Sequence, residues 1–313
     1  MATLCIVPFG KGALAAQLSI RELAEAFRSE RAEPIRVLTI TATHGYRHAP
    51  AIATTKTLLT ALNETTEFTF DITEDLDDLN QNNLEQYDLL FFANSTLRVD
   101  EQVGDQSFPI EGVVASGQQQ EKSTVRGLVT AEHRAAIIDF ISGGKGIVGA
   151  HSALDALYGW GEYRRMVGGG LFEAHPWTQQ VRILIEDPDN PAVAHLGDEL
   201  VIRDEIYVLD QNPRRTSHVL ASLDTTSVSI TPDGSRNDYP ISWMREHKGG
   251  RVFMTKLGHF PEVWTNPAFL QHLLQGMRMA AGRIQANFAS RQSLQLVNGP
   301  RFSAIRLPVT PED

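Results

Sequence analysis

Residues 143–153 read GGKGIVGAHSA, the pattern of a short buried strand that turns sharply into a helix at His151. Ile147 and Val148 supply the strand. Small residues on both sides of His151 let the backbone turn steeply and leave one side chain above the sheet. In hydrolases with such an elbow, the projecting residue is a serine or cysteine nucleophile. An imidazole in that place indicates acid/base chemistry or metal ligation instead.

Strands and helices alternate on the N-terminal side of this elbow. Strands are expected at residues 34–41, 67–71 and 88–92, and helices at 50–62 and 130–141. The run 88–92 is almost entirely apolar, as in a parallel strand covered on both faces. The alternation predicts an α/β fold with a doubly wound, mainly parallel sheet, whose ligand crevice lies at the carboxyl ends of the strands.

The second half of the chain is richer in strands. They are expected at residues 181–186, 217–223, 241–246 and 251–256, and a helix follows at 267–281. His247-Lys248-Gly249-Gly250 joins the last two strands and is typical of a hairpin turn. Residues 98–127 are polar and longer than most connections, which predicts a loop insertion or a lid.

The composition argues against several classes of protein. Of the 313 residues, 42% are hydrophobic and 21% charged, and the formal net charge of −10 would repel a nucleic acid. No run approaches the ~20 apolar residues of a membrane span, and no basic segment precedes the apolar start, which Lys11 interrupts. The single cysteine, Cys5, suits a reducing compartment. A cytoplasmic protein without a nucleic-acid or membrane partner is therefore expected.

Two glycine motifs resemble nucleotide-binding loops but lack their context. Residues 144–149 match G-x-G-x-x-G but precede a strand, which reverses the dinucleotide-binding order. Residues 10–15 lie between an apolar run and a helix-like run. The next expected strand, however, ends without the acidic residue that would hold a ribose. A structural turn is therefore favoured over a nucleotide site.

Five of the ten histidines lie beside glycine or in loops, namely His44, His48, His151, His175 and His259. A lone histidine is more often a core or surface group than a functional one. His48, His151 and His259, however, each follow or end an expected strand, so we expect them to meet in one cleft at the carboxyl edge of the sheet. These three are the candidate catalytic residues, as acid/base groups or as metal ligands.

The candidate carboxylates are Glu173, Asp204 and Glu205. Asp204 and Glu205 are neighbours in an expected strand, so the pleat sends them to opposite faces. One is expected to face the site and the other to be solvated, and Tyr207 shares the face of Glu205. Four aromatic residues would either stack on a sugar or fill the core, with the core favoured for each: Trp160, Tyr163, Trp243 and Trp264.

Seven short motifs follow one another along the chain. They are Tyr46-Arg47-His48; Gly143-Gly144 with Gly149-Ala150-His151-Ser152-Ala153; Gly168-Gly169 with Phe172 and His175-Pro176; Asp204-Glu205-Ile206-Tyr207; Pro240 with Trp243; Gly250-Arg251-Val252-Phe253; and Leu257-Gly258-His259. In this order they resemble the ThuA-like (trehalose utilisation) proteins, over roughly residues 35–283. The expected organisation is an N-terminal extension (1–33), a ThuA-like α/β domain (34–283) and a C-terminal tail (284–313).

The resemblance implies the flavodoxin-like fold of class I glutamine amidotransferases, with His151 where amidotransferases carry their cysteine. It also implies a part in the catabolism of trehalose and related disaccharides, alongside dehydrogenases that make 3-keto sugars. One departure is Tyr239, before Pro240, where the family usually has a histidine. If that histidine belongs to the family's site, the chemistry or the substrate of this chain is expected to differ.

The resulting hypothesis is an enzyme that acts on a disaccharide or its 3-keto derivative as a lyase, hydrolase or isomerase. A keto group acidifies the neighbouring C–H, and an imidazole with a pKa near neutrality can abstract that proton. A divalent metal, with zinc as the natural candidate, held by His48, His151 and His259 stays open. The candidate substrate-binding residues are His44, Tyr46, Arg47, Glu173, His175, Glu205, Tyr207 and Trp243.

The alternative is a non-catalytic sugar-binding or regulatory protein on the same fold, because fold does not dictate function. An active glutamine amidotransferase is not expected, because the elbow carries no cysteine. The expected partner is a small-molecule carbohydrate, and a homo-oligomer stays open.

Overall fold

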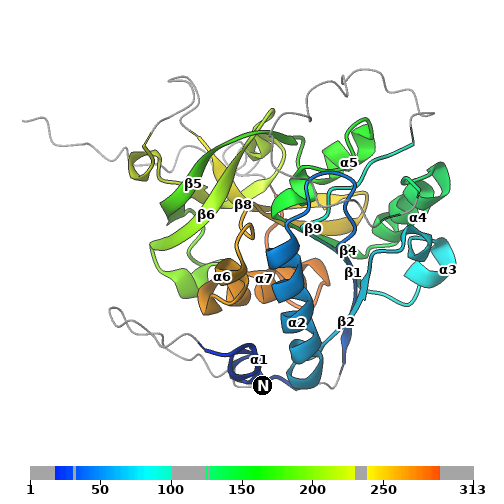
Figure 1. Ribbon diagram of the computed structural model, residues 1–313, viewed down its shortest axis with the longest axis horizontal. Helices are drawn as coiled ribbons and strands as arrows, with labels where there is room; N and C mark the ends of the chain where they lie inside the picture. Colours follow the sequence, from blue (N-terminus) through cyan, green and yellow to red (C-terminus); the bar gives the residue numbers. More distant parts are fainter. Residues whose placement is uncertain (1–17, 31–32, 101–124, 126, 230–237, 290–313) are drawn as a thin grey trace, which may run out of the picture.

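The computed structural model describes residues 18–30, 33–100, 125, 127–229 and 238–289. Within these residues the strands form one mixed sheet in the order β2-β1-β3-β4-β9-β8-β7-β5-β6 (Figure 1). The parallel half consists of β2 (Phe68–Thr73), β1 (Ile35–Ile40), β3 (Leu89–Ala93), β4 (Gly146–Ala150) and β9 (Gly250–Thr255). The antiparallel half consists of β8 (Pro240–His247), β7 (His218–Leu223), β5 (Phe172–Ile185) and β6 (Glu199–Leu209).

Helices cover both faces of the parallel strands. The α-helices are α1 (Ile20–Ala26), α2 (Ala49–Thr65), α3 (Gln81–Leu84), α4 (Ala131–Ser142), α5 (Gly161–Met166), α6 (Pro261–Trp264) and α7 (Pro267–Ala280). Short 3-10 helices are η1 (Leu76–Asp78), η2 (His151–Leu154), η3 (Ala194–Leu196), η4 (Pro213–Arg215) and η5 (Thr225–Ser227). One core contains residues of α1, α2, α6 and α7, and the other contains residues of α3, α4 and α5 (Figure 1). The doubly wound sheet with a β-rich second half is confirmed.

Strand β3 shows why this part of the sheet is buried on both sides. Leu89, Phe91 and Ala93 belong to the core beside α2, whereas Leu90 and Phe92 belong to the core beside α4. All five residues are buried, so the strand has no polar face. A continuous apolar run is therefore what this central position requires.

Local start and stop signals of the sequence also hold. The hairpin between β8 and β9 turns through Lys248 (φ 50°) and Gly249 (φ 90°), the two positive φ angles of the tight turn that matches strand twist. Thr130 begins α4 by accepting a hydrogen bond from the His133 amide, and His133 closes the capping box. Gly143 ends the same helix.

The strand expected at residues 181–186 is longer in the structure, and two other predicted segments lie outside the described residues. Residues 181–186 correspond only to the end of β5, which begins at Phe172. Register shifts between Phe172, Ala174 and Trp177 interrupt the alternation there, so the sequence pattern does not reveal the first part of the strand. Most of the expected lid, residues 101–124 and 126, and the glycine motif at 10–15 lie outside the described residues.

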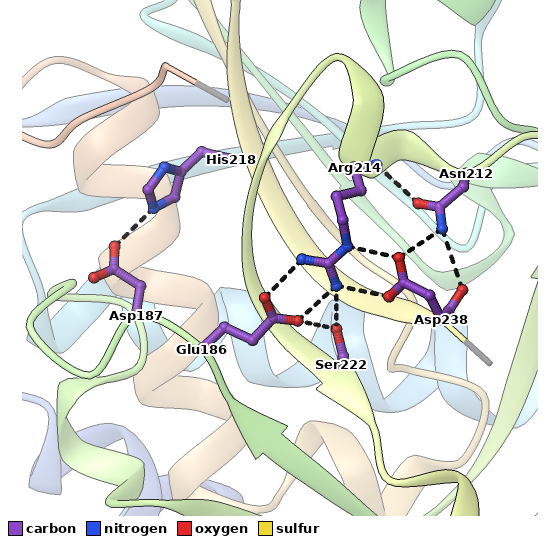
Figure 2. A network of polar contacts seen from close by, with 7 residues as sticks. All are labelled: Glu186, Asp187, Asn212, Arg214, His218, Ser222 and Asp238. Carbon is purple, nitrogen blue, oxygen red and sulfur yellow. Dashed lines mark hydrogen bonds and ion pairs between the residues drawn. The ribbon is translucent and has the colours of Figure 1, made fainter. Parts of the chain in front are cut away.

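Charged groups hold the antiparallel half together around Arg214. Its guanidinium donates to Glu186 on one side (2.7 Å) and to Asp238 on the other (2.6 Å), and also to Ser222 (Figure 2). Asn212 donates to the same Asp238 carboxylate. The hydrogen bonds that Arg214 donates to Glu186 and Asp238 raise its pKa, with that to Glu186 the largest effect. Because its donors are engaged in this way, Arg214 serves as a structural clamp on this end of the sheet.

The described parts of the two flanking segments pack on the core. Leu23 and Ala24 of α1 are buried in the core that α2 lines, and Phe288 packs against the same core. In the part of the chain that the structure describes, no helix is long and apolar enough to cross a membrane.

The position of β3 predicts a large loss of stability in Phe91→Ala. Phe91 is fully buried, so the substitution leaves a cavity, and we expect the free energy of unfolding to fall by about 3–5 kcal/mol. Val201→Ala is the control, because Val201 is 48% exposed on β6 and its truncation should change the free energy by about 0.5 kcal/mol or less. Urea unfolding of both variants measures this, and equal losses would contradict the two-faced burial of β3.

Candidate functional site

His151 stands at the end of β4 in a strained backbone conformation. Its φ of 48° lies in the left-handed region, which costs a non-glycine residue about 1–2 kcal/mol. The side chain is fully buried, and Nδ1 lies 2.9 Å from the Lys256 carbonyl oxygen. Because a carbonyl only accepts, Nδ1 carries the proton in this contact. In the neutral ring the lone pair of Nε2 therefore points the other way, into the site.

Three more side chains converge on this Nε2 atom. His48 Nε2 and His259 Nδ1 each lie 3.2 Å from it, and Glu205 Oε2 lies 3.5 Å away. The same Glu205 oxygen is 3.0 Å from His259 Nδ1. One nitrogen or oxygen atom from each of the four residues lies within 4.8 Å of the others. We call these four residues the His–Glu cluster.

The fold brings the cluster together from distant parts of the chain. His48 is the N-cap of α2, which follows β1, and His259 lies in the loop after β9. Like His151 after β4, both therefore stand at carboxyl ends of parallel strands, as the sequence predicts. Their proximity is confirmed by the distances, and their catalytic roles stay predictions. Glu205 reaches them from β6 in the antiparallel half.

A buried carboxylate fixes the loop that carries His259. Asp204 accepts hydrogen bonds from the amides of Gly258 (2.7 Å) and His259 (3.0 Å) and is fully buried. Burial raises the pKa of Asp204, while His151 and the amides of Gly258 and Glu205 oppose that rise. The expectation that one of the two neighbouring acids is solvated is wrong: Glu205 is buried in the cluster, and Asp204 is buried beneath it. Backbone amides replace water for Asp204, which the pleat of the strand alone does not reveal.

The cluster concentrates negative charge on Glu205. Burial by itself would raise the pKa of this carboxyl, but the neighbouring imidazoles of His151, His175 and His259 hold it far below its usual range. Burial and the neighbouring His151 and His259 lower the pKa of His48 well below its ordinary value. Glu205 is therefore a buried anion in contact with the imidazole rings of the site.

His175 lies at the solvent side of the same carboxylate. Its Nδ1 is 3.2 Å from Glu205 Oε1, and its side chain is 49% exposed. The hydrogen bond to Glu205 raises the pKa of His175. His175 therefore touches the buried anion and is more exposed to solvent than His151 and His259, the other two histidines that contact Glu205.

Aromatic rings line the site. The Tyr207 ring is centred 4.3 Å from that of His151, and Tyr46 packs edge-on against His48 at 4.7 Å. Phe172 bridges Tyr207 (4.5 Å) and His175 (5.6 Å). Tyr46 and Tyr207 were candidates from the sequence. Phe172 was not a candidate, because its position at the irregular start of β5 is not visible in the pattern.

Several residues that the sequence predicted to bind substrate make contacts outside the His–Glu cluster. The assignment of Trp243 to substrate binding is wrong, since the residue is fully buried and its Nε1 donates to the Val167 carbonyl. Arg47 donates to Glu74 (2.8 Å) at the end of β2. His44 binds the Gly127 carbonyl through Nε2 and accepts the Arg98 amide through Nδ1. These contacts hold loops around the site without adding to the His–Glu cluster.

Two further residues also lie outside the cluster. Glu173 follows Phe172 in β5 and is not one of the four converging groups. Tyr239, which stands where the ThuA-like pattern usually has histidine, packs edge-on against Trp177 in the core at 5.1 Å. This departure from the pattern therefore leaves the His–Glu cluster unchanged.

Comparisons with known proteins agree with the fold. The sequence profile of the ThuA family, described as trehalose utilisation, matches residues 36–280. A protein described as ThuA-like from Bacteroides uniformis ATCC 8492 shares 20% identity and a TM-score of 0.61, over 80% of this chain and 94% of its own. Another, from Parabacteroides merdae ATCC 43184, shares 18% identity and a TM-score of 0.53, over 82% and 93%. At these identities the likeness shows the fold alone. Among proteins with curated descriptions, none matches the sequence.

The hydrogen bond to Lys256 predicts the tautomer of His151. In metal-free protein at neutral pH, nitrogen-15 spectra of histidine-labelled protein should show His151 protonated on Nδ1. His272 is a matched control, because its Nδ1 lies 2.8 Å from the Ala192 carbonyl oxygen. It is also buried but does not belong to the cluster. Both rings should show the Nδ1–H form, and an Nε2–H form of His151 would contradict the direction assigned to its lone pair.

Proposed function

The chain belongs to the ThuA (trehalose utilisation) family, and on that premise we propose that it is an enzyme of carbohydrate breakdown built around a divalent metal held by the His–Glu cluster. Its substrate is a disaccharide or a 3-keto derivative of one. The reaction is an elimination, a hydrolysis or an isomerisation, three outcomes that share the movement of a proton beside a polarised carbonyl or glycosidic oxygen.

The convergence of the four side chains is the observation that carries this proposal. Tetrahedral zinc with ligands at about 2.0–2.1 Å sets its ligand atoms about 3.3–3.4 Å apart. His151 Nε2 lies 3.2–3.5 Å from the ligand atoms of the other three residues, and His259 lies 3.0 Å from Glu205. All four ligand atoms lie within 4.8 Å of one another. The donor set of three imidazoles and one carboxylate suits zinc among biological cations.

The surroundings of His151 support the same assignment. A ligating imidazole usually donates its other N–H to a carbonyl or carboxylate, which fixes the tautomer and the ring orientation. The contact between His151 Nδ1 and the Lys256 carbonyl is of this kind. A divalent ion in the cluster would polarise a carbonyl oxygen of the substrate or lower the pKa of bound water.

His175 is the protein group best suited to move a proton at this site. It is half exposed, touches Glu205 and has a raised pKa, so it can give up or take a proton near neutral pH. Tyr46, which is 37% exposed, offers apolar surface to a sugar ring beside these polar groups. A small pyranose ligand fits this mixture of rings and charged groups.

Metal analysis of the purified protein tests the cluster. We expect about one zinc ion per chain, released by a chelator, because four ligands of this type bind zinc tightly. His259→Ala should lose the ion. His133→Gln should keep it, because glutamine preserves the capping box at the start of α4, away from the cluster. A metal-free protein that binds no added zinc would contradict the metal centre.

A turnover screen tests the activity. Wild-type protein is assayed with trehalose, related disaccharides and their 3-keto derivatives, and His175→Asn is compared with it. We expect turnover of at least one of these sugars and a loss of about 10²–10⁴-fold in the variant, the usual contribution of a general acid or base. Binding of sugars without turnover of any would overturn the enzyme and favour the sugar-binding protein instead.

A further inference from the structure

The segment that begins with η2 at His151 also brings a carboxyl group to the site. Asp155 is the C-cap of η2 and is partly buried. It is not a member of the His–Glu cluster, and no motif of the sequence singles it out. We propose that Asp155 is the carboxylic acid of this site, which holds a proton near neutral pH and delivers it to an oxygen of the sugar. This inference rests on the proposed function.

The proposal rests on the number of protons available for the two contacts of the Tyr158 hydroxyl. The hydroxyl oxygen of Tyr158 lies 2.9 Å from Asp155 Oδ1 and 3.0 Å from the Phe172 carbonyl oxygen. A hydroxyl has one proton, whereas an ionised carboxylate and a carbonyl both only accept. With Asp155 ionised, only one of these two contacts is a hydrogen bond. With Asp155 protonated, it donates to Tyr158, and Tyr158 donates to Phe172, so both contacts are satisfied.

Burial acts in the same direction. The low polarity around the carboxyl disfavours its charged form and raises the pKa of Asp155 to about 6, against the electrostatic influence of His151 and Arg98. A group whose pKa lies near the working pH is the most effective acid or base in catalysis. Asp155 is thus suited to give up a proton and to regain it in each cycle.

Five titratable or charged groups interact with Asp155, by a hydrogen bond or electrostatically. They are His151 and Tyr158 from its own segment, Arg98 from the loop after β3, His175 from β5 and Tyr207 from β6. Tyr207 lies against His151, and Phe172 lies against both Tyr207 and His175. The Asp155–Tyr158–Phe172 chain is therefore joined to the wall of the His–Glu cluster.

The proposed step transfers one proton from Asp155 to an oxygen of the sugar. The O–H bond of the Asp155 carboxyl breaks while a new O–H bond forms on the oxygen that leaves the sugar or becomes a hydroxyl. The carboxylate regains a proton from water before the next cycle. His175, on the other side of Glu205, remains available to take the proton from a C–H or from water. One group gives a proton and another takes one, so no further reactant is required.

Infrared spectroscopy of the carboxyl groups tests whether Asp155 holds the proton. Difference spectra between wild type and Asp155→Asn are recorded across the neutral pH range, and neither substrate nor turnover is needed. We expect a neutral-carboxyl band that titrates near pH about 6 and is missing from the variant. Asp77→Asn is the control, because Asp77 is an exposed carboxyl away from the cluster, and it should leave this band intact. A band that titrates near the ordinary aspartate value of about 4 would overturn the proposal.

Tyr158→Phe tests the chain of hydrogen bonds. If Asp155 donates through Tyr158 to the Phe172 carbonyl, removal of the hydroxyl destabilises the neutral acid and lowers the pKa of Asp155. If Tyr158 instead donates to an ionised Asp155, the same substitution raises that pKa. The direction of the shift in the infrared titration decides between the two, and a rise would overturn the chain.

Turnover and metal content complete the test. Asp155→Asn should keep the metal content and the melting temperature close to those of wild type, and should lower kcat by about 10²–10⁴-fold. A variant that turns over as wild type does would overturn the role of Asp155 as acid. If wild-type protein itself has no turnover, the proposed function fails, and the infrared titration still decides whether Asp155 holds a proton.

Discussion

The hydrogen bonds between the buried carboxylate of Asp204 and the amides of Gly258 and His259 tie the antiparallel half of the sheet to the parallel half. A buried carboxylate without partners would cost several kcal/mol, so these amides make its position in the core tolerable. They also fix the loop after β9 against β6. The same arrangement sets the relative positions of Glu205 and His259, and with them the geometry of the site.

The charges of the residues in the His–Glu cluster determine the chemistry that the site can perform. Glu205 stays ionised because His151, His175 and His259 lower its pKa. His48 stays neutral because burial and the neighbouring His151 and His259 disfavour its cationic form. The strained backbone at His151 places an imidazole, rather than a nucleophile, at the end of β4. A cluster of three imidazoles and a carboxylate could hold a divalent metal ion.

The fold explains why such a site lies where it does. Parallel strands end at the same edge of the sheet, and in doubly wound proteins this edge is where ligands bind. The fold itself hosts many activities, so the relatives at 18–20% identity speak for the architecture and not for the reaction. Function must be argued from the side chains, which here combine three imidazoles, a low-pKa carboxylate and, behind Phe172, the carboxyl of Asp155.

The sequence by itself determined the architecture and the first members of the site. The apolar run of β3, the glycine-flanked elbow at His151 and the turn at Lys248-Gly249 are local signals, so they could be recognised without the structure. Strand ends share one edge, which is why the meeting of His48, His151 and His259 also follows from sequence alone. Only the tertiary structure decided how Asp204 and Glu205 are partnered and that Phe172 packs against Tyr207. These depend on contacts between residues far apart in the chain, such as the 54 positions between Asp204 and Gly258. A strand's pleat gives the face of a side chain but not the neighbour that it meets there.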